Sequence, residues 1–363
     1  MTARVFLLLI WAGCFVAVGV GPAEGETWQN PTDRYRDVYL RYVDAPCPIP
    51  PDEVRHFVYF ARDRAALASH ALLTHPRLAG AQVMYPWAHL EPTRDGYDFT
   101  AIREDLELLE AHGKRLFVQL QDATFSPEFK GVPDYLLAEE FGGGVARQLT
   151  DEGEHEGWAA RRWDPAVRDR FAKLLAALGQ AFDGRIEGIN LQESAIGVTE
   201  SADDFSPDIY AAALRENMSA LKAAFPRSTT LQYANFMPGE WLPWEDHGYL
   251  RSLYEHGNAI GVGLAAPDLM PRRRGQLNHA LALLHETDLR VPRGIAVQDG
   301  NYVGQTGSDE VVSPRPNLVP MLHGFARDFL RVDYMFWSNQ RPYFEQDLLP
   351  ALASPVPVPP SAP

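Results

Sequence analysis

The segment RIEGINLQESAIG, residues 185–197, places a carboxylate where acid–base chemistry is possible. An apolar run from Ile186 to Leu191 ends in Gln192 and Glu193, and small residues follow. A carboxylate at the end of a buried strand costs free energy unless a partner or a reaction uses it. Glu193 is therefore either a catalytic acid or the polar end of a strand, and the elements around it decide between the two.

Eight short apolar runs along the chain predict eight β-strands. The runs span residues 56–61, 80–87, 115–121, 186–192, 229–236, 259–265, 294–299 and 333–338. Several of them are almost continuously apolar, which is typical of parallel strands that helices cover. Segments with helical spacing separate the runs, and one begins with Asp164-Pro165, a cap followed by a proline in the first turn.

This alternation predicts an α/β fold, and in particular a single-domain (β/α)8 TIM barrel. A doubly wound open sheet is the alternative architecture. No glycine-rich phosphate loop follows the first run, which weakens the nucleotide-binding version of that alternative. The longest connection without a predicted strand, from Asp122 to about Trp163, is either a functional loop or a solvated surface insertion.

In such a barrel the functional residues lie at the carboxyl ends of the strands. The residues at those ends are Trp87, His89, Gln119, Gln121, Asp122, Gln192, Glu193, Tyr233, Asn235, Asp268, Gln298, Asp299, Asn301, Trp337 and Asn339. Amides and acids form hydrogen bonds with neighbouring hydroxyls, and aromatic faces pack against the C–H side of sugar rings. The set therefore predicts a carbohydrate site, although any barrel rim is polar.

One long segment carries a family resemblance. YPWAHLEPTRDGYDFTAIREDLELLEAHGKRLFVQ, residues 85–119, resembles the strand-two to strand-three region of clan A glycoside hydrolases, and it is most similar to the β-galactosidase-type members. The Trp-Asp-Pro sequence before the helix that leads into strand four, and the pair Phe336-Trp337, are also similar to that group. The resemblance covers about residues 80–200 and implies a glycoside hydrolase with a (β/α)8 barrel.

The resemblance also implies two catalytic carboxylates. The clan has Asn-Glu at the end of strand four, where this chain has Gln192-Glu193, so Glu193 is the expected general acid. The nucleophile of the clan is a glutamate on strand seven, where this chain offers Asp299 after Gln298. The shorter Asp299 side chain would favour a wider carboxylate gap and an inverting, water-mediated route. Alternatively, Gln298 occupies the nucleophile position and hydrolysis is lost.

The expected mechanism gives the remaining rim residues supporting roles. Glu193 would protonate the leaving oxygen, with Asp299 as nucleophile or as base for water. The predicted substrate-binding residues are Trp87, His89, Gln119, Gln121, Asp122, Gln192, Tyr233, Asn235, Gln298, Asn301 and Trp337, with Trp87 and Trp337 as platforms. Four further tryptophans either line outer subsites for the substrate or only pack within the fold: Trp158, Trp163, Trp241 and Trp244. No cofactor or metal is expected, because neither His-x-His nor His-x-x-x-His occurs.

The net charge bears on which partners the protein can bind, and a second motif resemblance suggests a second function. The net charge of −15 argues against nucleic acid and anionic membrane surfaces, and it does not repel a neutral carbohydrate. The run EGINLQE also resembles the strand-four motif of chitinase-type barrels, but with Asn190 and Gln192 at two acid positions. The second hypothesis is therefore a catalytically inactive carbohydrate-binding barrel, or an accessory protein in glycan processing or export.

The N-terminal residues predict export. Arg4, an apolar run and the small residues of GPAEG are typical of a signal peptide over residues 1–26, so a periplasmic or secreted location is expected. An uncleaved anchor and lipidation at Cys14 are the alternatives, and no membrane span is expected after cleavage. We expect a polar lead-in over 27–54, the barrel over 55–350 and a Pro-rich disordered tail over 351–363.

Overall fold

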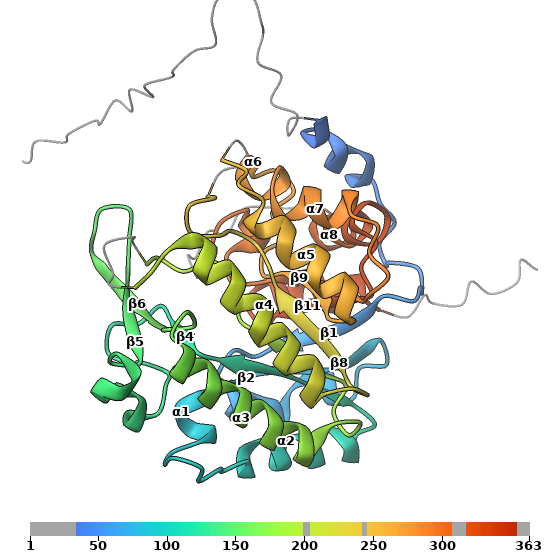
Figure 1. Cartoon of the computed structure of the whole chain (residues 1–363). Coiled ribbons are helices and arrows are strands. Elements are labelled where there is room, and N and C mark those ends of the chain that lie inside the picture. Colours follow the sequence, from blue (N-terminus) through green and yellow to red (C-terminus); the bar gives the residue numbers. More distant parts are fainter. Residues whose placement is uncertain (1–33, 199–203, 242–244, 307–316, 354–363) are drawn as a thin grey trace, which may run out of the picture.

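The computed structural model describes residues 34–198, 204–241, 245–306 and 317–353 (Figure 1). The expected signal peptide with Cys14, the first part of the lead-in, Trp244 and most of the expected tail lie outside the described residues. No helix in the described part of the chain is long and apolar enough to cross a membrane.

Eight parallel strands form a closed barrel, which confirms the (β/α)8 prediction. The barrel strands are β1 (Arg55–Tyr59), β2 (Leu78–Pro86), β3 (Arg115–Gln121), β7 (Gly188–Leu191), β8 (Thr229–Tyr233), β9 (Gly263–Ala266), β10 (Arg293–Val297) and β11 (Tyr334–Ser338). They lie around the barrel in chain order, and β11 closes it against β1 with Arg55 opposite Tyr334 and Tyr59 opposite Ser338. Closure excludes the doubly wound open sheet.

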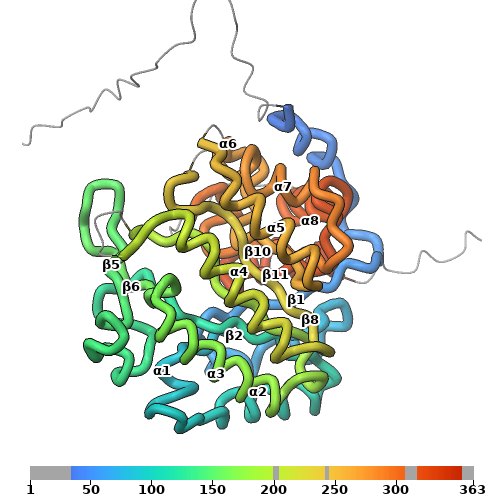
Figure 2. The backbone as a smooth tube through the Cα atoms, viewed as in Figure 1, coloured from blue at the N-terminus to red at the C-terminus, as the bar shows by residue number. Residues whose placement is uncertain are grey.

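Helices surround the barrel (Figures 1 and 2). The α-helices are α1 (Trp87–Leu90), α2 (Thr100–Ala111), α3 (Pro165–Phe182), α4 (Pro207–Ala224), α5 (Tyr249–Ile260), α6 (Arg274–Leu277), α7 (Ala280–Glu286), α8 (Leu318–Gly324) and α9 (Leu349–Ala351). The predicted cap of α3 is present, because the Asp164 side chain accepts the backbone N–H groups of Ala166 and Val167 at 2.8 and 3.1 Å.

Shorter turns complete the outer layer. The 3-10 helices are η2 (Val38–Tyr42), η3 (Arg64–Ser69), η4 (Ala71–Leu73), η5 (Asp134–Leu137), η6 (Glu139–Phe141) and η7 (Asn301–Val303), and two π-helices are η8 (Phe325–Leu330) and η9 (Phe344–Leu348). The lead-in contacts the C-terminal part of the chain, where Ile49 N–H donates to Ala351 O at 2.8 Å. Ala351 and Leu352 are buried, so the ordered chain continues past residue 350.

The barrel interior has an aromatic layer and a polar layer. Phe57, Phe117 and Phe336 fill the interior, with ring centroids 4.9–5.9 Å apart. Each buried phenylalanine contributes roughly 1.5–3 kcal/mol to stability. Gln82 donates to Asn190 Oδ1 at 2.9 Å and to the Tyr233 hydroxyl at 2.8 Å inside the barrel. The side chains that alternate with these on the strands pack against the helices.

The segment after β3 folds into a second, small sheet. β4 (Ala123–Thr124), β5 (Val145–Leu149) and β6 (His155–Ala160) form an antiparallel sheet in the order β4-β6-β5 at the edge of the barrel (Figure 1). The connection expected without strands, 122–163, therefore contains three. The buried Gln148 side chain donates to Thr124 O at 2.8 Å and accepts Gly197 N–H at 3.0 Å. This sheet is thereby tied to the chain that follows β7.

Candidate active site

Three carboxylates gather around one tyrosine at the carboxyl end of the barrel. Tyr59 ends β1 and is almost completely buried inside the barrel. Burial raises the pKa of Tyr59, and the charges of Asp299, Glu193 and Asp268 raise it further. These carboxylates come from the loops after β10, β7 and β9, so the structure brings together residues that are far apart in the sequence. We call this region the barrel mouth.

Glu193 lies half-buried at the mouth and is held by an amide. Asn235 donates from its side-chain nitrogen to Glu193 Oε2 at 2.7 Å. Burial raises the pKa of Glu193 to about 7, the charge of Asp268 adds to the rise, and Asn235 and Arg162 oppose it. An acid with this pKa is protonated in part of its molecules at neutral pH and ionised in the rest, which suits general acid catalysis.

A buried ion pair supports the Glu193 backbone. Arg162 Nε and Nη2 donate to the two oxygens of Asp122, both at 2.7 Å. Arg162 Nη1 donates to the Glu193 carbonyl at 2.8 Å and to the Tyr210 hydroxyl at 2.7 Å. Tyr210 donates in turn to Ser194 O at 2.9 Å. Asp122 was expected to bind substrate; in the structure both of its oxygens accept from Arg162 within a buried ion pair.

Two of the side-chain amides expected to bind substrate hydroxyls form hydrogen bonds within the protein instead. Gln192 Oε1 accepts the backbone N–H groups of Asp122 and Ala123 at 2.7 and 2.6 Å. Gln121 Nε2 donates to Ala123 O at 3.1 Å. Gln119 is buried inside β3, and its Oε1 has no hydrogen-bond partner within the described ranges. Gln192 therefore joins β7 to β3, and Gln119 retains an unused acceptor.

Asp268 is a second half-buried carboxylate at the mouth. Asn301 Nδ2 donates to Asp268 Oδ1 at 2.9 Å. Burial raises the pKa of Asp268, while the Asn301 hydrogen bond and the Arg273 charge oppose this rise. Asn301 Oδ1 also accepts the N–H groups of Leu269 and Gln298 at 3.2 and 2.9 Å. Asn301, expected to bind substrate, instead connects the loops after β9 and β10.

Asp299 is more exposed than the other two carboxylates. It follows Gln298 at the end of β10, and Ser338 Oγ on β11 donates to its Oδ1. The neighbouring charges that act most strongly on Glu193 are those of Asp268, Arg162 and Glu156, and Asp299 is not among them. Asp299 thus lies at the mouth but is held toward β11.

Two tryptophans expected as sugar platforms are buried. Trp87 and Trp337 are both 0% exposed, so neither ring has a face open to a ligand. Trp87 Nε1 donates to Glu91 Oε2 at 2.9 Å, and the ring packs against Phe171. Trp337 Nε1 donates to His56 Nδ1 at 3.0 Å outside the barrel. The platform prediction is wrong for both.

The other expected contact residues vary in exposure. Tyr233 is buried inside the barrel and its hydroxyl accepts from Gln82. His89 is exposed on α1 with its ring 5.9 Å from that of Phe129, and Gln298 is half-buried. Of the candidate outer tryptophans, Trp163 is buried, Trp158 donates to Pro127 O at 2.7 Å, and Trp241 is 40% exposed.

Sequence reasoning missed Tyr59, Arg162 and Tyr210. Tyr59 ends the first predicted strand, where its position gives a usable signal. Arg162, just after the small sheet, reaches the Glu193 carbonyl, and Tyr210 of α4 contacts Arg162 and Ser194. No spacing in the sequence indicates these contacts.

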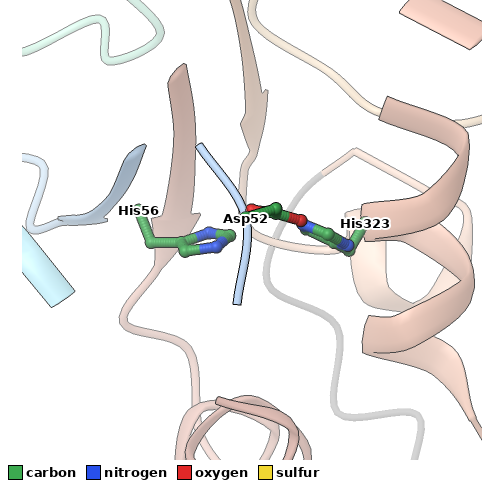
Figure 3. A group of neighbouring side chains, drawn as sticks. All are labelled: Asp52, His56 and His323. Atoms are coloured by element: carbon green, nitrogen blue, oxygen red, sulfur yellow. The ribbon is translucent and has the colours of Figure 1, made fainter. Parts of the chain in front are cut away.

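One group of side chains elsewhere has the spacing of metal ligands. Figure 3 shows Asp52 between the rings of His56 and His323, and one ligand atom from each lies within 4.8 Å of the others. The indole N–H of Trp337 can only donate, so His56 Nδ1 accepts and the proton of the neutral ring is on Nε2. Nε2 then has no lone pair for a cation. Burial lowers the pKa of His56 and of His323, the His323 charge lowers that of His56 further, and the Asp52 carboxylate opposes the fall for His323. This group, which we call the Asp52 clasp, fits a link between the lead-in and α8 better than a metal site.

Comparisons with known proteins agree with the fold. No family model and no curated protein matches this chain. The solved structure of the catalytic domain of β-amylase from Paenibacillus polymyxa aligns with a TM-score of 0.56 and 8% identity, over 80% of this chain and 92% of that one. A GH5_18 structure from Bifidobacterium longum subsp. infantis aligns with a TM-score of 0.50 and 15% identity, over 78% of this chain and 69% of that one. The chain therefore has a barrel fold that these two structures share.

Proposed function

We propose that this protein is an exported glycoside hydrolase that cleaves an oligo- or polysaccharide. The observation that carries the proposal is Glu193 itself, a half-buried carboxyl with a pKa of about 7 at the carboxyl end of a parallel barrel. Active residues of such barrels lie at this end. The shared fold with a β-amylase supports the same reading but does not identify the reaction.

In the proposed reaction Glu193 is the general acid. It protonates the glycosidic oxygen as the bond to the anomeric carbon breaks, and an ionised carboxylate completes the reaction as nucleophile or as base for water. The resemblance assigns this second role to Asp299. Asn235 orients the Glu193 carboxyl, and Arg162 fixes its backbone.

A carbohydrate-binding barrel without turnover is the second candidate. The observation that favours it is the position of Asp299, which is exposed and bonded to Ser338 rather than directed at Glu193. The burial of Trp87 and Trp337 removes the two expected platforms from both candidates alike. This candidate predicts saturable glycan binding by the wild type and by Glu193→Gln, with no release of reducing ends from either.

The test is a screen for hydrolysis with a matched pair of variants. Purified protein is incubated with 4-nitrophenyl glycosides of common hexoses, pentoses and N-acetylhexosamines, and with soluble polysaccharides, and nitrophenol and reducing ends are measured. We expect turnover by the wild type, loss of about 10²-fold or more in Glu193→Gln, and full activity in Glu110→Gln, an exposed control on α2. Turnover that survives in Glu193→Gln contradicts the proposal. Fractionation of producing cells tests export.

A further inference from the structure

Asp268 shares the environment of Glu193 more closely than Asp299 does. β8 alone separates β7 from β9 in the barrel, and Asp268 follows β9 by two residues. Among neighbouring charges, that of Asp268 acts most strongly on Glu193. Like charges influence one another in this way only at short range, because water and salt screen more distant pairs. Both carboxyls are half-buried, and both follow strands at the same end of the barrel.

The Asp268 carboxylate is fixed at one oxygen and open at the other. Asn301 Nδ2 donates to Oδ1 at 2.9 Å and also to Gln305 O at 2.9 Å. With Leu269 N–H and Gln298 N–H on its Oδ1, Asn301 uses all its hydrogen-bonding groups. Oδ2 of Asp268 has no hydrogen-bond partner within the described ranges. A rigid carboxylate with one oxygen open is suited to act on a bound water.

Asp299 has a different environment. It is exposed to solvent, and Ser338 of β11 donates to one of its oxygens. β11 lies on the far side of β10 from β9, so this bond holds Asp299 away from the strands that carry Glu193 and Asp268.

We infer that Asp268, rather than Asp299, is the carboxylate that works with Glu193, as the general base of an inverting hydrolysis. The inference rests on the proposed function and replaces one residue in it. Asp268 Oδ2 removes a proton from a water whose oxygen forms a bond to the anomeric carbon. The bond to the leaving oxygen breaks with its electron pair on that oxygen, which takes the proton from Glu193. Asp268 ends protonated, Glu193 ends ionised, and exchange with solvent restores both.

The first experiment compares substitutions on the best substrate found in the screen. We expect Asp268→Asn to lose about 10²–10⁴-fold in kcat, and Asp299→Asn to lose at most about tenfold. Sodium azide, which needs no base, is expected to restore turnover in Asp268→Gly by forming a glycosyl azide. A larger loss in Asp299→Asn, or azide rescue in Asp299→Gly alone, overturns the inference while leaving the proposed function intact.

The second experiment does not require turnover. Glutamate labelled with ¹³C at the side-chain carboxyl carbon is incorporated, and the Glu193 signal is assigned from its absence in Glu193→Gln. We expect the Glu193 pKa to fall by about one pH unit or more in Asp268→Asn, and to stay within about 0.3 unit in Asp299→Asn. An unchanged Glu193 pKa in Asp268→Asn overturns the pairing, even if no substrate has been found.

Discussion

Asn235 donates a hydrogen bond of 2.7 Å to Oε2 of Glu193, and this bond opposes the effect of burial on the acid. Burial keeps the proton on Glu193, while the amide N–H stabilises the ionised form that remains after the proton has left. Asn235 is itself fixed, since its Oδ1 accepts Ala195 N–H at 3.2 Å and its backbone N–H donates to Ser194 Oγ at 3.1 Å. The amide therefore orients the acid and limits the rise in its pKa.

The Asn235→Ala variant tests this relationship. Loss of the N–H donor removes an interaction that lowers the pKa of Glu193, so the pKa rises above its present value of about 7. The alkaline limb of the kcat/KM profile is expected to move up by about one pH unit. The pH profile on a screened substrate, or the ¹³C titration, measures the shift. The matched control is Asn258→Ala, whose amide contacts Asp288 O and Arg290 N–H at the surface. An unmoved limb would show that Asn235 does not interact with the acid.

Glu193 should cost stability at alkaline pH. Its folded pKa of about 7 exceeds its ordinary value of 4.5, so the folded chain binds more protons between these values. Stability therefore falls as pH rises from about 4.5 to 7. We expect Glu193→Gln to be more stable than the wild type by about 3 kcal/mol at pH 8, and equal to it at pH 4. Urea unfolding at both pH values measures this, and an equal difference at both would exclude a titration effect.

The strand positions could be predicted because buried strands are rich in apolar residues, and such runs can be read from the sequence. The apolar residues Ile186, Ile189 and Leu191 are buried in or just before β7, and this run ends where Gln192 and Glu193 reach the mouth. The helix at 165–182 could be predicted from its cap and apolar stripe. The order of the strands then places Glu193, Asn235 and Asp299 at one end without any knowledge of their contacts.

The direction of each side chain could not be predicted in the same way. In a strand that is apolar on both faces, alternation does not reveal which face points inward. Tyr334 and Phe336 point into the barrel, so Trp337 points out and meets His56. Trp87 begins α1, and its ring packs against Phe171 of α3 instead of lining the mouth. The Arg162–Asp122 pair joins positions forty residues apart, and the small sheet of β4, β5 and β6 folds between them and brings them into contact.

Removing Arg162 should destabilise the fold strongly. Arg162 and Asp122 are both almost fully buried, with side-chain exposures of 4% and 6%. Arg162→Met leaves a buried carboxylate unpaired, and we expect a loss of about 3–5 kcal/mol in the free energy of unfolding. The double variant Arg162→Met/Asp122→Asn removes the uncompensated charge and should recover part of the loss. Chemical denaturation measures all three proteins, and a double variant less stable than Arg162→Met would contradict this account.

The Asp52 clasp should make stability depend on acid and not on metal. His323 Nε2 lies 3.0 Å from Asp52 Oδ2, and burial holds the pKa of His323 well below its ordinary value of 6.5. The unfolded chain therefore binds the extra proton first, so stability is full above about pH 6.5 and falls as pH decreases.

We expect the wild type to lose about 1–2 kcal/mol more than His323→Gln between pH 7 and pH 5. Thermal unfolding at both pH values measures this difference, and His112→Gln, an exposed residue at the end of α2, is the control. Zinc and EDTA should leave the Tm of the wild type unchanged, because Trp337 keeps the proton of His56 on Nε2. A zinc-dependent rise in Tm that disappears in His323→Gln would instead identify the clasp as a metal site.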